Sequence, residues 1–202
     1  MSSKEIRLFS YTFIGLILPV LLIYFDGIPF KYRSFVLFFV IAITFLGIYT
    51  EKMSKVDLGI RIDNLKIAFL PYFLFTLITA VLVAWYAGYA GKPGIENWWN
   101  VPYLQFVFIP TSVSQEFIYR GFFQTQYQRV FKPAVSIILS AIIFSFMHIL
   151  WNSTEFLIMT LIGGLFWGIL WQKYPNLLLI SVSHAILNFI INYFGFITIG
   201  SR

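Results

Sequence analysis

Long apolar runs separated by short polar stretches make up the pattern of hydrophobic and polar positions along this chain. Seven runs can be marked, at about 8–25, 34–50, 67–90, 102–130, 133–150, 154–172 and 177–197. A helix needs roughly 20 residues to cross a bilayer, and backbone polar groups in lipid must bond within the chain. The period-two alternation of membrane-barrel strands is missing. The pattern therefore predicts an all-α, polytopic integral membrane protein with about seven transmembrane helices.

Turn-forming residues lie between the runs and support these boundaries. They include Asp26-Gly27, the Gly91 to Gly94 stretch, Lys132-Pro133 and Tyr174-Pro175-Asn176. The connection 51–66 is the one long polar segment, and its composition is typical of an interfacial linker.

Composition favours the same class. The chain is 59% hydrophobic and 11% charged, with a mean hydropathy of +0.83, whereas a soluble domain is about 45–50% apolar and about 25% charged. Cysteine is absent, which excludes disulfides, a thiol nucleophile and thiolate metal sites. The net charge of +6 forms no Lys/Arg cluster long enough for nucleic acid. The expected partner is the lipid bilayer, and no nucleic acid.

The distribution of basic residues predicts the orientation. With the N-terminus inside, the inner segments carry nine Lys and Arg residues and the outer segments carry four. The inner ones are Lys4, Arg7, Lys52, Lys55, Arg61, Lys66, Arg129, Lys132 and Lys173, and the outer ones are Lys31, Arg33, Lys92 and Arg202. The positive-inside rule then favours an inner N-terminus. We expect a multi-pass protein of a prokaryotic cytoplasmic membrane.

A few polar residues lie inside the apolar runs, and each belongs to a pair of residues four positions apart. The pairs are Glu116 with Arg120, Phe144 with His148, and His184 with Asn188. Residues at this spacing share a helix face. An ionisable residue at membrane depth costs at least about 2.5–3.5 kcal/mol, so it usually faces a partner or a wet cavity.

Each pair has a purely structural interpretation when it is taken alone. Glu116 and Arg120 could neutralise each other, His148 could bond a backbone carbonyl, and His184 could join helices by hydrogen bonds. Together, a carboxylate and two imidazoles can activate water and stabilise an oxyanion. The same groups also suit a proton relay or a metal site, and the spacing alone does not choose among these.

Order and spacing of these residues resemble the CPBP family of intramembrane proteases, which includes the type II CAAX prenyl endopeptidase and bacteriocin-processing or immunity proteins. That family shows Glu-Glu-x-x-x-Arg, Phe-x-x-x-His and His-x-x-x-Asn/Asp on successive membrane helices. The resemblance covers roughly residues 56–196 and includes Asp57-Leu58-Gly59-Ile60. We expect a single transmembrane domain, 1–202, with 56–196 as the family core and 1–55 as two additional N-terminal spans.

The resemblance implies peptide-bond hydrolysis of a peptide or membrane-protein substrate. It assigns water activation to a motif glutamate with His148, the oxyanion site to His184 with Asn188, and organisation of the acidic pair to Arg120. Gln115 occupies the position of the first glutamate, and a neutral amide cannot take a proton from water. Glu116 could be the base in a variant subgroup, the chain could be a non-cleaving relative, or the glutamine could be an inactivating substitution.

Positions 115 and 116 point about 100° apart around a helix. Arg120 shares a face with Glu116, so Glu116 is expected to clamp Arg120 while position 115 faces His148. We predict a polar cavity formed by spans four, five and seven and lined by Glu116, His148, His184 and Asn188. No cofactor is expected, and no metal, because Arg120 opposes a second cation beside Glu116. A non-catalytic scaffold or immunity protein and a small proton-coupled transporter are the alternative functions.

Overall fold

The computed structural model describes residues 2–196, and within this range the regular structure is entirely helical. Seven helical runs match the seven apolar runs in order and position. They contain α1 (Ser3–Thr12) with α2 (Leu18–Tyr24), α3 (Arg33–Thr50), α4 (Leu65–Tyr89), α5 (Phe108–Glu116) with α6 (Thr125–Gln128), α7 (Pro133–Phe146), α8 (Thr154–Lys173) and α9 (Leu177–Tyr193). The all-α prediction is confirmed.

The number of membrane spans remains a prediction. Four described helices have the length and hydropathy to cross a bilayer: Ser3–Tyr24, Leu65–Tyr89, Pro133–Trp151 and Thr154–Lys173. Phe35–Thr50 and Leu177–Tyr193 are apolar but shorter. Residue 197 of the last predicted run and Arg202 of the predicted outer charges lie outside the described residues.

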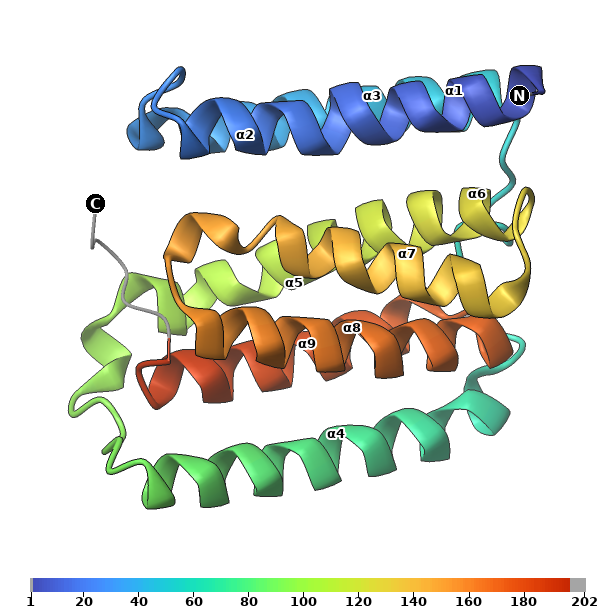
Figure 1. The fold of residues 1–202 in the computed structure, drawn as a ribbon. Coiled ribbons are helices and arrows are strands. Elements are labelled where there is room, and N and C mark those ends of the chain that lie inside the picture. The colour runs from blue at the N-terminus through green and yellow to red at the C-terminus, as the bar shows by residue number, and fades with distance from the viewer. Residues whose placement is uncertain (1, 197–202) are drawn as a thin grey trace.

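The helices lie side by side with their long axes roughly aligned (Figure 1). The N-terminal helices α1, α2 and α3 form one side of the bundle, and α4 lies at the opposite side (Figure 1). Between them α7 packs on α8, α5 packs on α9, and α9 also packs on α4. Helices α5, α7 and α9 therefore lie in the interior, and the residues of the three pairs lie on them or directly after them.

Helix starts follow ordinary capping chemistry. Ser2 and Glu5 form a capping box at α1, Ser153 accepts a hydrogen bond from Phe156 N at α8, and Asn176 accepts one from Leu179 N at α9. Pro133 begins α7, where its missing N–H costs nothing. These residues fix where α1, α7, α8 and α9 begin.

Close contacts join the N-terminal helices to the interior. The Tyr11 ring packs edge-on to Phe122 at 5.8 Å, and Thr12 and Tyr127 share a 2.9 Å hydrogen bond between their hydroxyl groups. Gly47 of α3 faces the Phe122 ring, with no room for a Cβ atom between them. The first two predicted spans therefore pack on the same bundle as the polar pairs.

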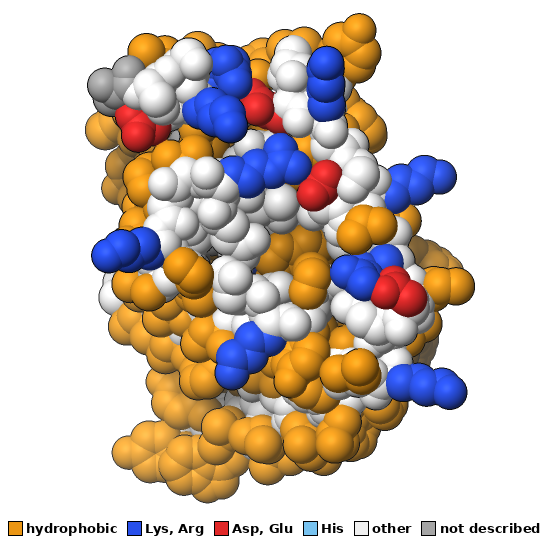
Figure 2. Space-filling view, turned by 90° about the vertical axis from the view of Figure 1, so that its right-hand side faces the viewer, with side chains coloured by type: hydrophobic (Ala, Val, Ile, Leu, Met, Phe, Trp, Pro, Cys, Tyr) orange, Lys and Arg blue, Asp and Glu red, His pale blue; other side chains and the backbone are white. Residues whose placement is uncertain are grey.

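Charged side chains gather at the end of the bundle that includes the N-terminus. Figure 2 shows this end, where many Lys and Arg side chains and few acidic ones lie among apolar side chains. We call it the basic end, defined by Lys4, Arg7, Lys52, Lys55, Arg61, Lys66, Arg129, Lys132 and Lys173. The sides of the bundle expose large apolar residues such as Phe35, Phe38, Trp85 and Phe106, as expected for surface in contact with lipid.

Candidate active site

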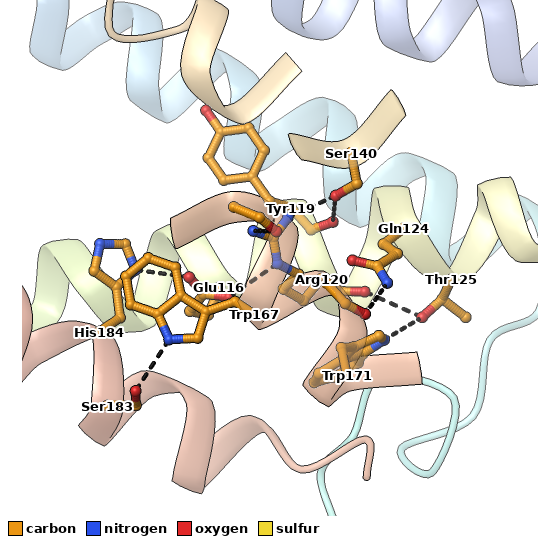
Figure 3. Close-up of polar contacts among 12 residues, drawn as sticks. Glu116, Tyr119, Arg120, Gln124, Thr125, Ser140, Trp167, Trp171, Ser183 and His184 are labelled. Carbon is orange, nitrogen blue, oxygen red and sulfur yellow. Dashed lines mark hydrogen bonds and ion pairs between the residues drawn. The ribbon is translucent and has the colours of Figure 1, made fainter. Parts of the chain in front are cut away.

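Glu116 is the centre of a buried cluster of charged and polar side chains (Figure 3). Both Glu116 and Arg120 are fully buried. The Glu116 Oε1 atom lies 2.6 Å from His184 Nδ1, and its Oε2 atom lies 3.6 Å from Arg120 Nε. The Glu116 carboxylate therefore contacts two side chains. One is Arg120, the expected partner four residues later, and the other is the His184 imidazole of α9, 68 residues later in the chain.

Arg120 ties this cluster to two further helices. Its Nη1 atom donates to Ser140 Oγ of α7 at 2.6 Å, and its Nη2 atom donates to the backbone carbonyl of Gly164 in α8 at 3.2 Å. The guanidinium also lies over the Phe144 ring, 5.3 Å from its centroid. These contacts compensate the buried charge, as an ion in an apolar interior requires.

The backbone that carries Arg120 is a π-helical stretch, Phe117–Gln124, directly after α5. Seven of its eight residues, from Ile118 to Gln124, are buried. A π-helical turn is wider than an α-helical one and is found frequently at functional sites. Arg120, Phe122, Phe123 and Gln124 all lie in the interior on this stretch.

His184 is held on two sides. Its ring stacks on the Trp167 indole, with centroids 4.5 Å apart and planes 29° apart, and meets Phe144 edge-on at 5.7 Å. The indole is fixed in turn, because Trp167 Nε1 donates to Ser183 Oγ at 3.0 Å. With Glu116 ionised, Nδ1 of His184 carries the proton of their hydrogen bond, which leaves Nε2 for the cavity.

His148 lies just beyond the end of α7, before the short helix Ile149–Trp151. Its Nδ1 atom is 2.7 Å from the carbonyl oxygen of Phe144. A carbonyl only accepts, so Nδ1 must donate, and Nε2 of the neutral ring carries a lone pair. His148 therefore makes the expected structural hydrogen bond to a backbone carbonyl through Nδ1, while its Nε2 atom stays available for chemistry.

The Asn188 amide is oriented by three neighbours. Its Oδ1 atom accepts from the Tyr103 hydroxyl at 3.3 Å and from Asn192 Nδ2 at 2.7 Å. Its Nδ2 atom donates to Ser112 Oγ at 3.2 Å. The two donors on Oδ1 set the direction of the amide. One of the two N–H bonds of Nδ2 is then left over, on a side chain that lines the cavity.

A cavity of about 830 Å³ connects these groups. Gln115, His148, His184 and Asn188 all line it, and the rest of its wall is largely apolar. Its volume is within the range of about 300–1,000 Å³ that is usual for ligand pockets. The Gln115 side chain makes no hydrogen bond to any other residue that the structure describes, so its amide is available to a bound molecule.

Two expectations about this cavity need correction. Glu116 does not line it, because its side chain is fully buried behind His184. Spans four, five and seven do not form it alone, since α3, α4 and α8 also contribute wall residues, among them Leu37, Phe75 and Trp167. The pattern of polar residues could not reveal these walls, because apolar side chains make them.

Several residues of the site carry weak signals or none in the sequence. Ser112 lies four positions before Glu116, so the helical spacing used for the other pairs could have found it. Ser140 lies four positions before Phe144 in the same way, whereas Tyr103 and Trp167 follow no such spacing. Among residues 2–196 no group of three His, Asp, Glu or Cys side chains is arranged to hold a metal ion.

Fold and site together define a class, a multi-pass helical membrane protein with a polar site enclosed between its helices. Residues 97–190 match the model of the family described as Type II CAAX prenyl endopeptidase Rce1-like. This match confirms the resemblance inferred from the three motifs, and it contains every residue of those motifs. The family is a family of proteases. Neither the curated proteins nor the solved structures include a match to the chain.

Proposed function

We propose that this protein is an intramembrane endopeptidase of the glutamic type, whose cavity receives a peptide or a membrane-protein segment. The observation that carries the proposal is the convergence of His148, His184 and Asn188 on one cavity of about 830 Å³ that Gln115 also lines. The same four positions match the family pattern in order and spacing. The cavity has room for several residues of an extended chain beside the polar groups.

The proposed reaction begins with a water molecule between residue 115 and Nε2 of His148. As the water oxygen bonds to the peptide carbonyl carbon, its proton passes to this nitrogen. His148 then returns the proton to the amide nitrogen, the C–N bond breaks, and the products are an acid and an amine. The basis for this role is the lone pair that the Phe144 carbonyl leaves on Nε2.

The free N–H of Asn188 and a protonated His184 would stabilise the oxyanion of the tetrahedral intermediate. His184 donates from Nε2 only when both ring nitrogens carry protons. The carboxylate of Glu116 accepts a hydrogen bond from Nδ1 at 2.6 Å, which fixes the ring so that Nε2 faces the cavity. Glu116 and Arg120 therefore act through His184 and hold the helices in place, without touching the substrate.

Because position 115 is a glutamine, we expect the given sequence to hydrolyse peptides only weakly. Its amide can orient the water but cannot accept its proton, so in the given sequence His148 acts as the base without the carboxylate that would share this role. We expect Gln115→Glu to create or strongly raise peptide cleavage, because it places a carboxylate on the cavity wall.

The test compares the given chain, Gln115→Glu and Glu116→Gln on a peptide library in liposomes. Gln105→Glu is the matched control, since Gln105 is exposed on the same helical run and does not line the cavity. Cleavage by Gln115→Glu alone supports the proposal. Strong cleavage by the given chain that only Glu116→Gln abolishes would make Glu116 the base and refute the assignment of position 115.

A second function, a non-catalytic scaffold or immunity protein, is favoured by the same glutamine. In that case the cavity binds a partner segment without cleaving it. Binding of a membrane peptide by the given chain, with no product from Gln115→Glu under any condition tested, is the outcome that selects this function.

We also propose an orientation with the N-terminus inside a prokaryotic cytoplasmic membrane. The asymmetry between the basic end and the opposite end supports it, because the basic end carries nine of the Lys and Arg residues. Accessibility of single introduced cysteines at the two ends tests this, and the chain is suited to it because it has no cysteine of its own.

A further inference from the structure

A second hollow, of about 220 Å³, lies at the basic end and away from the cavity described above. It forms where α1 begins, α3 ends and α6 ends. Its lining residues are Lys4, Leu8, Tyr11, Thr50, Glu51, Lys52, Gln126, Arg129 and Val130. It therefore joins three helix ends that are far apart in the sequence.

The charges around this hollow are unequal. Lys4, Lys52 and Arg129 contribute three cations, and Glu51 contributes the one carboxylate. Glu51 is already paired, because its Oε1 atom lies 2.7 Å from the Nε atom of Arg7. Lys4 and Lys52 form no ion pair with any residue that the structure describes. The hollow thus has positive charge in excess, with two ammonium groups available to a ligand.

Several other polar groups that line the hollow already have hydrogen-bond or ion-pair partners within the protein, so the cations are the main groups available to bind a ligand. Thr50 Oγ1 donates to backbone carbonyls of its own helix, and the Tyr11 hydroxyl lies 2.8 Å from it. Arg129 is shared with Asp57, at 3.3 Å. The excess of positive charge favours an anionic ligand that is recognised chiefly by charge.

The surroundings indicate which anion this is. Within about one turn of the lining residues, apolar side chains are exposed on both flanking helices: Ile6 at 53% and Phe9 at 61% on α1, and Leu46 at 52% and Tyr49 at 81% on α3. In a membrane protein such surface contacts acyl chains. The basic hollow lies at the ends of these same helices, where acyl chains give way to headgroups.

We infer that the hollow between α1, α3 and α6 binds the phosphate of an anionic phospholipid, with Lys4 and Lys52 as its principal contacts and Arg129 at its edge. The acyl chains lie along the exposed apolar residues of α1 or α3. Basic pockets between transmembrane helices on the inner side suit phosphate headgroups in this way.

The site has a structural consequence. Lys4 lies in α1 and Lys52 lies just after the end of α3, so both precede the matched segment 97–190, whereas Arg129 lies inside that segment. A bound headgroup therefore bridges the N-terminal helices to the part of the chain that carries the candidate active site. This inference does not depend on the proposed peptidase activity.

The experiment is a titration of the purified full chain with phosphatidylglycerol, and separately with phosphatidylcholine, followed by native mass spectrometry of the lipid-bound states. The test variants are Lys4→Ala, Lys52→Ala and their combination. The matched control is Lys55→Ala with Lys132→Ala, which removes the same charge from the basic end but not from the hollow. We expect affinity for the anionic lipid to fall about fivefold for each lysine removed from the hollow.

Selective binding of phosphatidylglycerol that the combined variant loses and the control retains supports the site. Equal losses in the combined variant and the control would overturn it, since the attraction would then belong to the whole face. Displacement of the lipid by inorganic phosphate at equal concentration would also overturn it, by showing a site for soluble phosphate.

Discussion

Replacing Arg120 by methionine tests whether the buried cluster is held together by its charge. Arg120 is fully buried, and its guanidinium contacts Glu116, Ser140 and the Gly164 carbonyl. Methionine keeps much of the volume but leaves the Glu116 carboxylate without its cation. Breaking a buried pair by removing one partner costs about 3–5 kcal/mol. A chain of this size loses about 2–4 °C in Tm for each kcal/mol, so we expect a drop of about 6–20 °C.

The measurement is thermal unfolding in one detergent, followed by the fluorescence of the six tryptophans. The control is Arg129→Met, because the Arg129 side chain is 36% exposed and pairs with Asp57 at the surface. Exposed pairs contribute about 0–1 kcal/mol, so its Tm should hardly change. Comparing the two variants separates the loss of a buried charge from the loss of an arginine.

A double-mutant cycle decides the cause. Combining Arg120→Met with Glu116→Gln removes both charges, so the double variant should be more stable than the sum of the single losses predicts, by about 0.5–3 kcal/mol. Additive losses would refute the reasoning, because they would mean that Arg120 stabilises the fold by packing alone.

Three further predictions concern other parts of the chain. The Asp57 pKa lies below its usual 3.8, chiefly because its carboxylate accepts a hydrogen bond from the Ser54 backbone N–H. The ionised carboxylate therefore stabilises the fold fully at pH values above the usual pKa. This stabilisation is lost as the pH falls through the lowered pKa of the folded protein. The Tm difference between the protein and Asp57→Asn should therefore be largest near neutral pH and vanish in acid, and a difference independent of pH would contradict it. Gly59→Ala should lower the free energy of unfolding, measured in denaturant, more than Gly91→Ala does. Both glycines have a positive φ, 69° and 64°, so alanine is strained at either position. Only at Gly59 would the added Cβ atom also overlap the Trp171 ring. Chelators should leave any cleavage by Gln115→Glu unchanged, whereas loss that zinc restores would show a metal site.

The helical runs could be predicted from hydropathy because lipid forces backbone groups to bond locally, and all seven lie where the pattern places them. The pairs four apart could be predicted for the same reason, since Glu116 and Arg120 share one helix. Contacts between helices could not. That Glu116 bonds His184 depends on how α5 and α9 pack, and no spacing within either helix encodes it. The π-helical stretch could not be predicted either, because its residues are as apolar as those of an α-helix.

The buried cluster also constrains the order in which the chain can enter a membrane. Glu116 and Arg120 are synthesised before all three of their interhelical partners. Ser140 comes 20 residues after Arg120, Gly164 comes 44 residues after it, and His184 comes 68 residues after Glu116. Until α7 and α8 are made, leaving the insertion machinery for lipid would cost this segment at least about 2.5–3.5 kcal/mol for the arginine alone, and Glu116 lacks its His184 partner until α9 is made. We therefore expect the segment after residue 102 to be held back in the translocon and to enter the bilayer together with α7, α8 and α9 as one unit.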